Sequence, residues 1–213
     1  RFTSLVPDPP ASWGDALFLL GAASAVLGVA FALGQHDLKR LLAWHSVENI
    51  GIIVLGLGVG LGGRAAGRPE WALLGFAGGL FHVVNHGLFK PLLFLGAGEA
   101  AHVAGTRDMD RMGGLARVLP KTALLFVAGA VAISGLPPLN GFASEWLVYL
   151  GLFDRARATG ADALRAAFGV PALALTGALA LACFVKAHGA VSPETAREMA
   201  AGAEGPAAFA AEG

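Results

Sequence analysis

The segment FHVVNHGLFKPLLFL, Phe81 to Leu95, sets the class of this protein, because it embeds two histidines and a lysine in an otherwise apolar run. The surrounding run, from Trp71 to about Gly98, is long enough to cross a bilayer as a helix, which needs about 20 apolar residues. A charged side chain at the centre of such a helix costs roughly 2.5 to 3.5 kcal/mol, so it usually faces a protein interior or a water-filled path. The segment therefore predicts a membrane helix with a polar face.

The whole chain has the composition of a membrane protein. Of its 213 residues, 55% are hydrophobic and 14% are charged, whereas soluble domains are about a quarter charged. The mean hydropathy is +0.64. The 15 basic and 15 acidic residues balance, which argues against a nucleic-acid partner. The single cysteine, Cys183, lies in an apolar run and is interpreted as a small hydrophobic residue.

Five segments are long and apolar enough to span a lipid bilayer, which predicts an all-α integral membrane fold. They run from Ala16 to Gln35, Leu41 to about Leu61, Trp71 to about Gly98, Lys121 to Phe153, and about Ala166 to Lys186. The segments exceed strand lengths and show no alternating pattern, and helices satisfy their own backbone groups in lipid. The predicted domains are an N-terminal loop at 1–15, a transmembrane domain at 16–188 and a polar, disordered tail at 189–213.

The fourth span is too long for one straight helix and is interrupted by SGLPPLNG, residues 134–141. Two adjacent prolines remove two backbone donors, and glycines loosen both flanks. The residues of this predicted helix break are Gly135, Pro137, Pro138 and Gly141. Irregular backbone at membrane depth is tolerated only where protein or a wet cavity surrounds it, and broken helices often mark ion sites. Glu145, just after the break, is therefore a candidate proton-carrying carboxylate; the alternative is a plain loop with Glu145 at the membrane interface.

His82, His86 and Lys90 share one face of the third span, because residues four apart lie about 6 Å apart along a helix and only about 40° apart around it. Asn85 lies beside this stripe. Histidine exchanges protons near neutral pH, and a buried lysine can also do so. The stripe is therefore a candidate proton relay, and Pro91 is predicted to kink the helix next to Lys90.

Two other interpretations of the stripe remain open. The histidines could join helices through hydrogen bonds, and Lys90 could extend its ammonium group to the membrane interface. Two histidines four residues apart could also share a metal ion. The metalloprotease pattern His-Glu-x-x-His is absent, however, because Val83 occupies the place of the glutamate, and we expect no metal site.

The second span has its own polar face, made by His45, Glu48 and Asn49 at spacings of three and four residues. A carboxylate inside a membrane needs a partner, and the helix that carries Lys90 is an obvious supplier. A purely structural salt bridge is the alternative. Lys39, at the start of this span, is either a topology anchor or a further member of the relay.

Four ordered motifs carry a family resemblance. HDLKRLLAWHSVENIGIIVLGLG, FHVVNHGLFKPLLFLGAGEAAH, MGGLARVLPKTALLF and SGLPPLNGFASEWLVY resemble the antiporter-like proton-channel subunits of respiratory complex I, membrane-bound hydrogenases and multisubunit cation/proton antiporters. Within that family, WHSVENIGI and GLPPLNGFASEW most resemble the large membrane subunit of the hydrogenase-4 and formate hydrogenlyase group. The resemblance covers residues 15–188.

The resemblance implies two inverted five-helix repeats, each a half-channel with a discontinuous helix. The five predicted spans match the second repeat, so the chain is expected to be the C-terminal-half fragment of a longer subunit. By this resemblance, Lys90 corresponds to the relay lysine of the family. Other relay positions of the family correspond to His82, His86, Lys39 and Glu145. Glu48 favours the hydrogenase-like branch, whereas Pro91 departs from the small residue that relatives generally have there.

The expected function is that of a proton-translocating membrane subunit of a hydrogenase-4/formate hydrogenlyase-like or complex I-like (NADH:quinone) oxidoreductase in the inner membrane of a prokaryote. The chain has no cysteine cluster and no dinucleotide-binding fingerprint. We therefore expect no cofactor in this chain, and we expect a peripheral hydrogenase or dehydrogenase arm and other membrane subunits as partners. Two alternatives remain: a cation/proton antiporter subunit, and a membrane anchor of a hydrogenase that does not pump.

Overall fold

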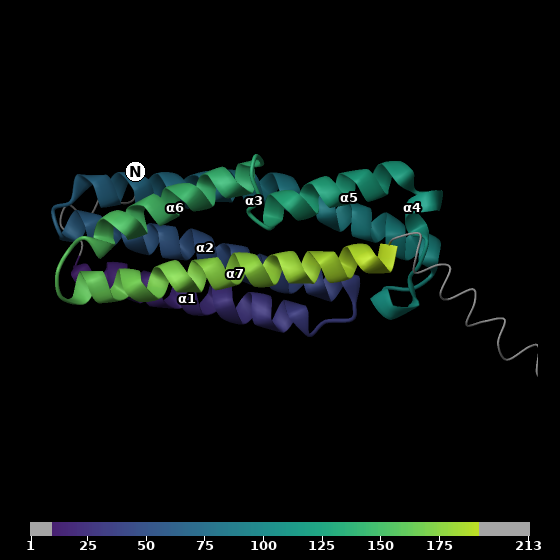
Figure 1. The fold of residues 1–213 in the computed structure, drawn as a ribbon, viewed down its shortest axis with the longest axis horizontal. Coiled ribbons are helices and arrows are strands. Elements are labelled where there is room, and N and C mark those ends of the chain that lie inside the picture. Colours follow the sequence, from purple (N-terminus) through teal and green to yellow (C-terminus); the bar gives the residue numbers. More distant parts are fainter. Residues whose placement is uncertain (1–9, 192–213) are drawn as a thin grey trace, which may run out of the picture.

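The computed structural model describes residues 10–191, which form a bundle of long helices lying side by side (Figure 1). The elements are α1 (Ala11–Leu33), α2 (Leu38–Ala65), α3 (Pro69–Ala104), η2 (Met109–Arg111), α4 (Leu115–Val118), α5 (Pro120–Ile133), α6 (Asn140–Ala156) and α7 (Ala161–Val191). Residues 1–9 and 192–213 lie outside the described residues, and with them much of the predicted N-terminal loop and nearly all of the predicted tail.

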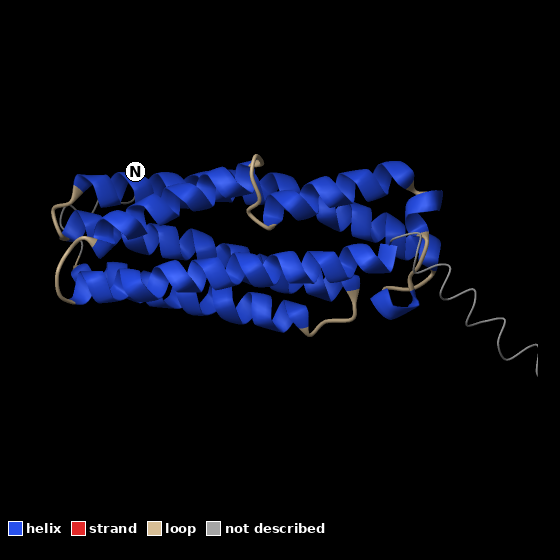
Figure 2. Cartoon of the chain, viewed as in Figure 1, coloured by secondary structure: helices blue, strands red, loops and turns tan. Residues whose placement is uncertain are grey.

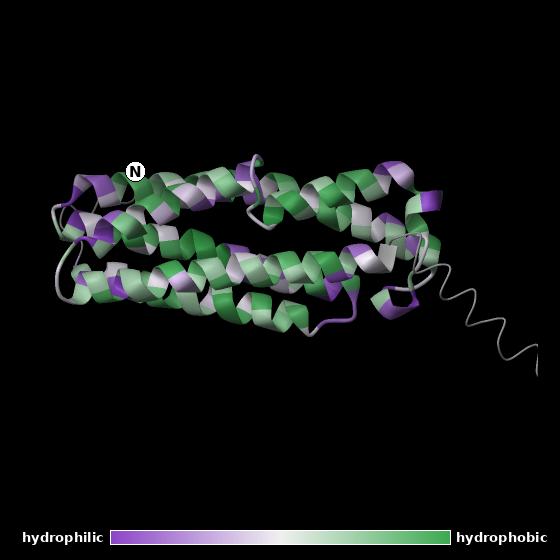
Figure 3. Ribbon diagram, in the orientation of Figure 1, coloured by the Kyte–Doolittle hydropathy of each residue, from purple (hydrophilic) through white to green (hydrophobic). Residues whose placement is uncertain are grey.

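Four helices, α1, α2, α3 and α7, are long and apolar enough to cross a membrane, and α5 is a shorter apolar helix. Helices α5 and α6 follow one another along the bundle with a loop between them (Figure 2). Apolar residues cover most of the visible helix surface, and the strongly polar residues gather near the helix ends and the loops (Figure 3). The prediction of an all-α integral membrane protein with a discontinuous fourth span is confirmed.

Several helix boundaries differ from the predicted spans. Helix α1 begins at Ala11, so the predicted loop at residues 1–15 extends too far. Helix α7 begins at Ala161, before the predicted start near Ala166. Asp15 in α1 and Asp162 in α7 lower the hydropathy of these segments, so the predicted spans begin after them. In the structure both aspartates are helical, because each is paired with an arginine. Helix α3 has 36 residues and continues through Pro91.

Helices α1 and α2 approach closely through glycines. A Cβ atom added at Gly14 would lie 2.6 Å from the backbone nitrogen of Gly62, and one added at Gly28 would lie 2.5 Å from that of Glu48. Small residues let membrane helices pack backbone against backbone. This contact fixes the position of the α2 backbone that carries Glu48.

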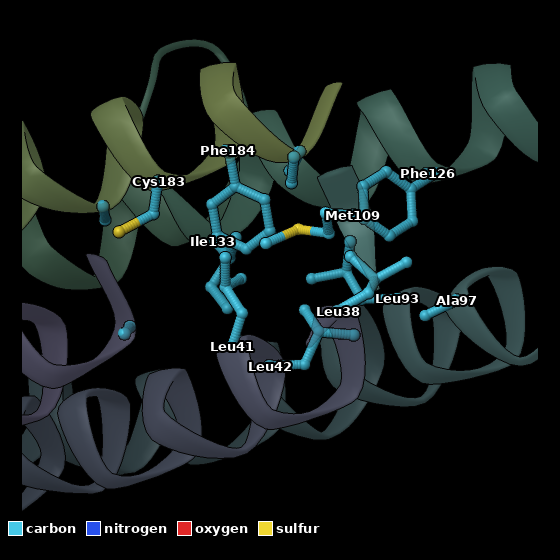
Figure 4. Packing of buried hydrophobic residues seen from close by; sticks show 14 of the residues in the cluster. Leu38, Leu41, Leu42, Leu93, Ala97, Met109, Phe126, Ile133, Cys183 and Phe184 are labelled. Atoms are coloured by element: carbon cyan, nitrogen blue, oxygen red, sulfur yellow. The ribbon is translucent and has the colours of Figure 1, made fainter. Parts of the chain in front are cut away.

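A hydrophobic cluster fills the space between α2, α3, α5 and α7. In Figure 4, Phe184 and Cys183 of α7 and Phe126 of α5 lie near Leu42 of α2 and Leu93 of α3. Cys183 is buried and has a free thiol, which agrees with its interpretation as a small hydrophobic residue. The cluster surrounds the turn of α2 at Leu42. The buried polar groups described below therefore border an apolar region at this turn.

The loop after α1 is held by the segment around η2. The backbone N–H of Leu38 donates to the Arg107 carbonyl at 2.9 Å, and that of Met109 donates to the His36 carbonyl at 2.8 Å. The exposed side chains of His36 and Asp110 pair at 2.6 Å. These contacts hold the first turn of α2 in place at this end of the bundle.

Candidate functional site

Polar side chains from α2, α3 and α6 gather inside the apolar bundle. Apart from Arg155 at the far end of α6, those with at most 7% of their surface exposed are His45, Glu48, Asn49, His82, Asn85, Lys90, Ser144 and Glu145. Buried polar groups need hydrogen-bond partners. The contacts among these residues therefore define the candidate site.

Lys90 lies at the contact between the antiparallel helices α2 and α3. Its ammonium group donates to the backbone carbonyl of Leu42 and lies 5.5 Å from the centre of the Phe94 ring. Eight residues earlier on α3, about 12 Å along the helix, His82 Nε2 is 3.0 Å from Oδ1 of Asn49. The predicted polar face of α3 therefore runs along the interface with α2.

Glu48 has its direct partner on its own helix. His45 Nδ1 forms a hydrogen bond with Oε2 of Glu48, and both side chains are buried. The His45 ring stacks on Phe184 of α7 at 4.7 Å between ring centres, and its Nε2 has no partner among the described residues. The sequence suggested the helix of Lys90 as the supplier of this partner, and the structure assigns it to His45 instead, because residues three apart share a helix face.

A second set of contacts joins α3 to α6. His82 Nδ1 lies 2.9 Å from the hydroxyl of Ser144, and Asn85 Nδ2 donates to the same hydroxyl at 2.9 Å. Asn85 and Asn140 share two further hydrogen bonds: Asn85 Nδ2 donates to the backbone carbonyl of Asn140 at 2.8 Å, and Asn140 Nδ2 donates to Asn85 Oδ1 at 3.0 Å. The start of α6 is thus fastened to α3 at His82 and Asn85.

The helix break lies beside the turn of α3 that carries Lys90. On one side of the break, a Cβ added at Gly129 of α5 would lie 3.0 Å from the Leu93 side chain. On the other side, Asn140 of α6 bonds to Asn85. The loop between α5 and α6 is therefore bracketed by Asn85 and Leu93, and Lys90 falls within that interval.

Glu145 lies against the break. Gly135 has φ +63°, and a Cβ there would lie 2.6 Å from Oε2 of Glu145, so only glycine fits this position. A groove of about 530 Å³ between the break, α6 and α7 opens beside the Glu145 side chain and is also lined by Trp146 and Tyr149. The Glu145 carboxyl group therefore lies at the edge of this groove.

Two predicted relay residues lie apart from this network. Lys39 is half-buried in the first turn of α2, about 9 Å along the helix from His45. Within the part of the chain that the structure describes, it makes no hydrogen bond or ion pair. His86 is half-buried, and its Nε2 is buried without a partner among residues 10–191. The stripe on α3 is therefore linked across helices at His82 and Lys90 rather than from one member to the next.

Ser144 and Asn140 belong to the site and are absent from the sequence prediction. Both are uncharged, and hydropathy analysis gives them little weight. Their spacing of four residues on the segment that follows the break is the signal that could have identified them, because it places them on one face of α6. No group of three or more potential metal ligands is found among the described residues, and the expected lack of a metal stays a prediction.

A separate polar cluster lies at the end of the bundle where α6 meets α7. Arg155, only 1% exposed, donates to Oδ1 of Asp162 at 2.7 Å and lies 3.6 Å from Asp15 of α1. Arg165 pairs with Asp15 at 2.6 Å and with Asp162 at 3.0 Å. Arg155 lies two residues beyond the predicted end of the fourth span at Phe153, but it is helical and buried, because these carboxylates stabilise its charge inside the bundle.

Comparison with known proteins gives a consistent set of relatives. Residues 1–169 match the model of a protein family described as "NADH:quinone oxidoreductase/Mrp antiporter, TM". The chain is 48% identical to hydrogenase-4 component B of Escherichia coli K12 over 182 residues, which cover 84% of the chain and 27% of that protein. It is 45% identical to formate hydrogenlyase subunit 3 of the same organism over 184 residues, covering 85% of the chain and 30% of that protein.

A solved structure supports the same fold. The chain is similar to a chain of the Mrp complex from Dietzia sp. DQ12-45-1b, with a TM-score of 0.66 and 27% identity over 83% of this chain and 29% of that chain. The chain thus spans less than a third of the length of each of these relatives. The apolar helices and the bacterial relatives identify it as an integral protein of a prokaryotic plasma membrane.

Proposed function

Because the chain belongs to the transmembrane NADH:quinone oxidoreductase/Mrp antiporter family, we propose that it forms one proton half-channel of a longer proton-translocating membrane subunit. The observation that carries this proposal is the buried line of exchangeable groups from Lys90 to Ser144, which lies beside a break in a membrane helix. Ionisable groups at membrane depth usually mark ion or proton pathways. An apolar bundle without that role would avoid the cost of burying them.

Lys90 is the central carrier in this proposal. Its ammonium group can release a proton and then take up another, while the Leu42 carbonyl holds the amine in place. His82 and His86 continue the path along α3, and Glu145 connects it to the groove at the helix break. Each group binds and releases one proton, so the path moves protons without any change of covalent structure.

Water completes the path where no side chains meet. His45 Nε2 and His86 Nε2 are buried and have no partner among the described residues. Such atoms are the usual partners of buried water molecules, which bridge polar groups almost as well as a direct hydrogen bond. The His45–Glu48 pair and Lys39 then extend the path along α2 toward the bundle end where α1 turns into α2.

The energy for transport comes from outside this chain in our proposal. The similarity to hydrogenase-4 component B and formate hydrogenlyase subunit 3 favours a complex with other membrane subunits and a peripheral redox arm that holds the cofactors. A charge change in that arm would alter the field at one end of the polar line. Alternating acids and bases can pass on such a change, because each charge alters the proton affinity of the next group.

The test replaces Lys90 with alanine in the full-length subunit, within its complex, reconstituted in lipid vesicles. We expect proton flux to fall by about 100-fold or more, the scale of a lost proton-transfer group, with unchanged assembly. Lys121→Ala is the matched control, since Lys121 is exposed at the start of α5, and it should leave flux unchanged. Unchanged flux in assembled Lys90→Ala complexes would contradict the relay and favour a membrane anchor that does not pump.

A cation/proton antiporter subunit is the second candidate, and the similarity to a chain of the Mrp complex favours it. The two candidates differ in what drives the protons. A sodium or potassium gradient imposed across the same vesicles should drive proton flux through an antiporter. It should leave proton flux unchanged in a redox-driven subunit.

A further inference from the structure

When His82 Nδ1 is unprotonated, the Ser144 hydroxyl lies within hydrogen-bonding distance of more acceptors than its single hydrogen can reach. Its oxygen is 2.9 Å from His82 Nδ1, 2.9 Å from Asn85 Nδ2 and 2.9 Å from the Gly141 carbonyl. The side chain is fully buried, so bulk water does not compete for these contacts. A hydroxyl group has one hydrogen and can accept two hydrogen bonds. The backbone carbonyl of Asn140 is a third acceptor, but it lies farther away, at 3.3 Å, and already accepts from Asn85. The two nearer acceptors of the hydroxyl hydrogen are therefore His82 Nδ1 and the Gly141 carbonyl.

The neighbouring amides fix the other hydrogens of the network. Asn85 Nδ2 donates to the Asn140 carbonyl while its Oδ1 accepts from Asn140, so its second N–H donates to Ser144. Asn49 Nδ2 donates to the His45 carbonyl at 2.7 Å, so Oδ1 of Asn49 accepts from His82 Nε2. His82 therefore carries a hydrogen on Nε2 in both of its charge states. The proton that it gains or loses is on Nδ1, which faces Ser144.

We infer that Ser144 is a positioning residue whose hydroxyl lets His82 change its charge, an inference that rests on the proposed proton-relay function. When His82 is neutral, the Ser144 hydroxyl donates its hydrogen to Nδ1. When Nδ1 takes up a proton, the new N–H donates to the Ser144 oxygen, and the hydroxyl hydrogen turns to the Gly141 carbonyl. The proton comes from the preceding carrier of the proposed relay, which loses one bond to hydrogen as one N–H bond forms on His82. All buried donors and acceptors of this network stay paired in both states.

This rotation links His82 to the helix break. Gly141 follows the break, and Gly135 on its other side contacts the Glu145 carboxyl group. The hydrogen bonding of the first turn of α6 therefore changes when His82 changes its charge. Titratable groups on each of the three helices around His82 act on the same equilibrium: His86 and Lys90 on α3, His45 and Glu48 on α2, and Glu145 on α6.

Two substitutions distinguish the effect of the Ser144 hydroxyl group from the effect of the side-chain volume. Ser144→Ala removes the hydroxyl group, and Ser144→Thr keeps it and adds a methyl group. In vesicles that contain the complex with the full-length subunit, we expect proton flux to fall about tenfold in Ser144→Ala, on the scale of one lost buried hydrogen bond. Ser144→Thr should retain flux within about twofold.

Lower proton flux in Ser144→Thr than in Ser144→Ala would overturn the inference. If Ser144 serves only packing, the larger threonine at this fully buried position should be the worse variant. Equal flux in Ser144→Ala and the unchanged protein, together with loss of flux in Lys90→Ala, would overturn the role of Ser144 and leave the relay standing. Unchanged flux in Lys90→Ala would overturn the relay itself.

A spectroscopic measurement keeps the test decisive where Ser144→Ala fails to assemble. Nitrogen-15 NMR of histidine-labelled complex distinguishes the two neutral tautomers, and the His82 signal is identified by its loss in His82→Gln. We expect neutral His82 in the unchanged protein to carry its hydrogen on Nε2. A hydrogen on Nδ1 would overturn the inference, because Ser144 would then have nothing to donate to on that ring.

Discussion

The two buried polar regions of this bundle have different chemistry. The cluster around Arg155 joins permanent opposite charges, with two arginines facing two aspartates at the bundle end. The central network, from Lys90 to Ser144, joins histidines, amides and a hydroxyl, and His45 Nε2 within it has no partner among the described residues. Arginine does not release its proton in proteins, whereas histidine does so near neutral pH.

This difference in chemistry separates the polar groups that hold the bundle together from those that can carry protons. Arg155 contacts carboxylates on α1 and α7 and lies 5.4 Å from the centre of the Phe18 ring. It therefore stabilises the arrangement of three helices. The central network instead contains groups that can be paired in more than one protonation state, which is what transport requires.

The largest expected effect is on stability, at the Arg155 cluster. In Arg155→Ala, Asp15 and Asp162 keep Arg165 as a partner and are 26% and 31% exposed. The loss therefore comes mainly from the hydrogen bonds of the buried guanidinium group to a carboxylate, and hydrogen bonds to charged groups contribute up to about 3 kcal/mol. We expect the free energy of unfolding of the full-length subunit in detergent to fall by about that amount. Proton flux per assembled complex should stay unchanged.

Arg157→Ala is the control for this comparison. Arg157 has the same chemistry, but its side chain is 82% exposed and its pair with Asp154 is 3.9 Å long. Its loss should change the free energy of unfolding by less than about 0.5 kcal/mol. A loss of flux in assembled Arg155→Ala complexes would remove the distinction between the two regions.

Gly28→Ala tests how strictly the central network depends on helix packing. The added methyl group would press on the backbone of Glu48, and overpacking of this kind costs about 2 kcal/mol. We expect both the free energy of unfolding and the proton flux to fall. Gly87→Ala on α3, where a Cβ would meet no atom within 4 Å, should be neutral or stabilising by about 0.5 kcal/mol.

The amide pair between α3 and α6 is expected to give a smaller effect. Asn85→Ala and Asn140→Ala should each lower the free energy of unfolding by about 1 kcal/mol. Because the two amides bond to one another, the double variant should lose less than the sum of the single variants. Additive losses would mean that the pair does not fasten α6 to α3.

The smallest effect is expected outside both regions, at the exposed pair of His36 and Asp110. Their side chains are 64% and 62% exposed, and exposed ion pairs contribute little. Asp110→Asn should change the free energy of unfolding by less than about 0.5 kcal/mol, measured by the same detergent titration. A larger loss would show that the loop after α1 is held mainly by this pair.

Some of the site could be predicted from the sequence because it depends on spacing within one helix. Residues three or four apart share a helix face, which correctly grouped His45 with Glu48 and placed His82 and Lys90 on one face of their helix. The structure shows that this face meets α2. The helix break was also predictable, since adjacent prolines cannot continue a helix. The kink at Pro91 stays a prediction.

By itself, the sequence determined the class of the fold, the membrane spans and the candidate proton carriers, because hydropathy and helical spacing are local properties of the chain. Only the tertiary structure decided which helices meet. It assigned His45 rather than Lys90 to Glu48, brought Ser144 and Asn140 to His82 and Asn85, and buried Arg155. Contacts between helices depend on how each helix is rotated and shifted against its neighbours, and close packing across the whole bundle sets that arrangement.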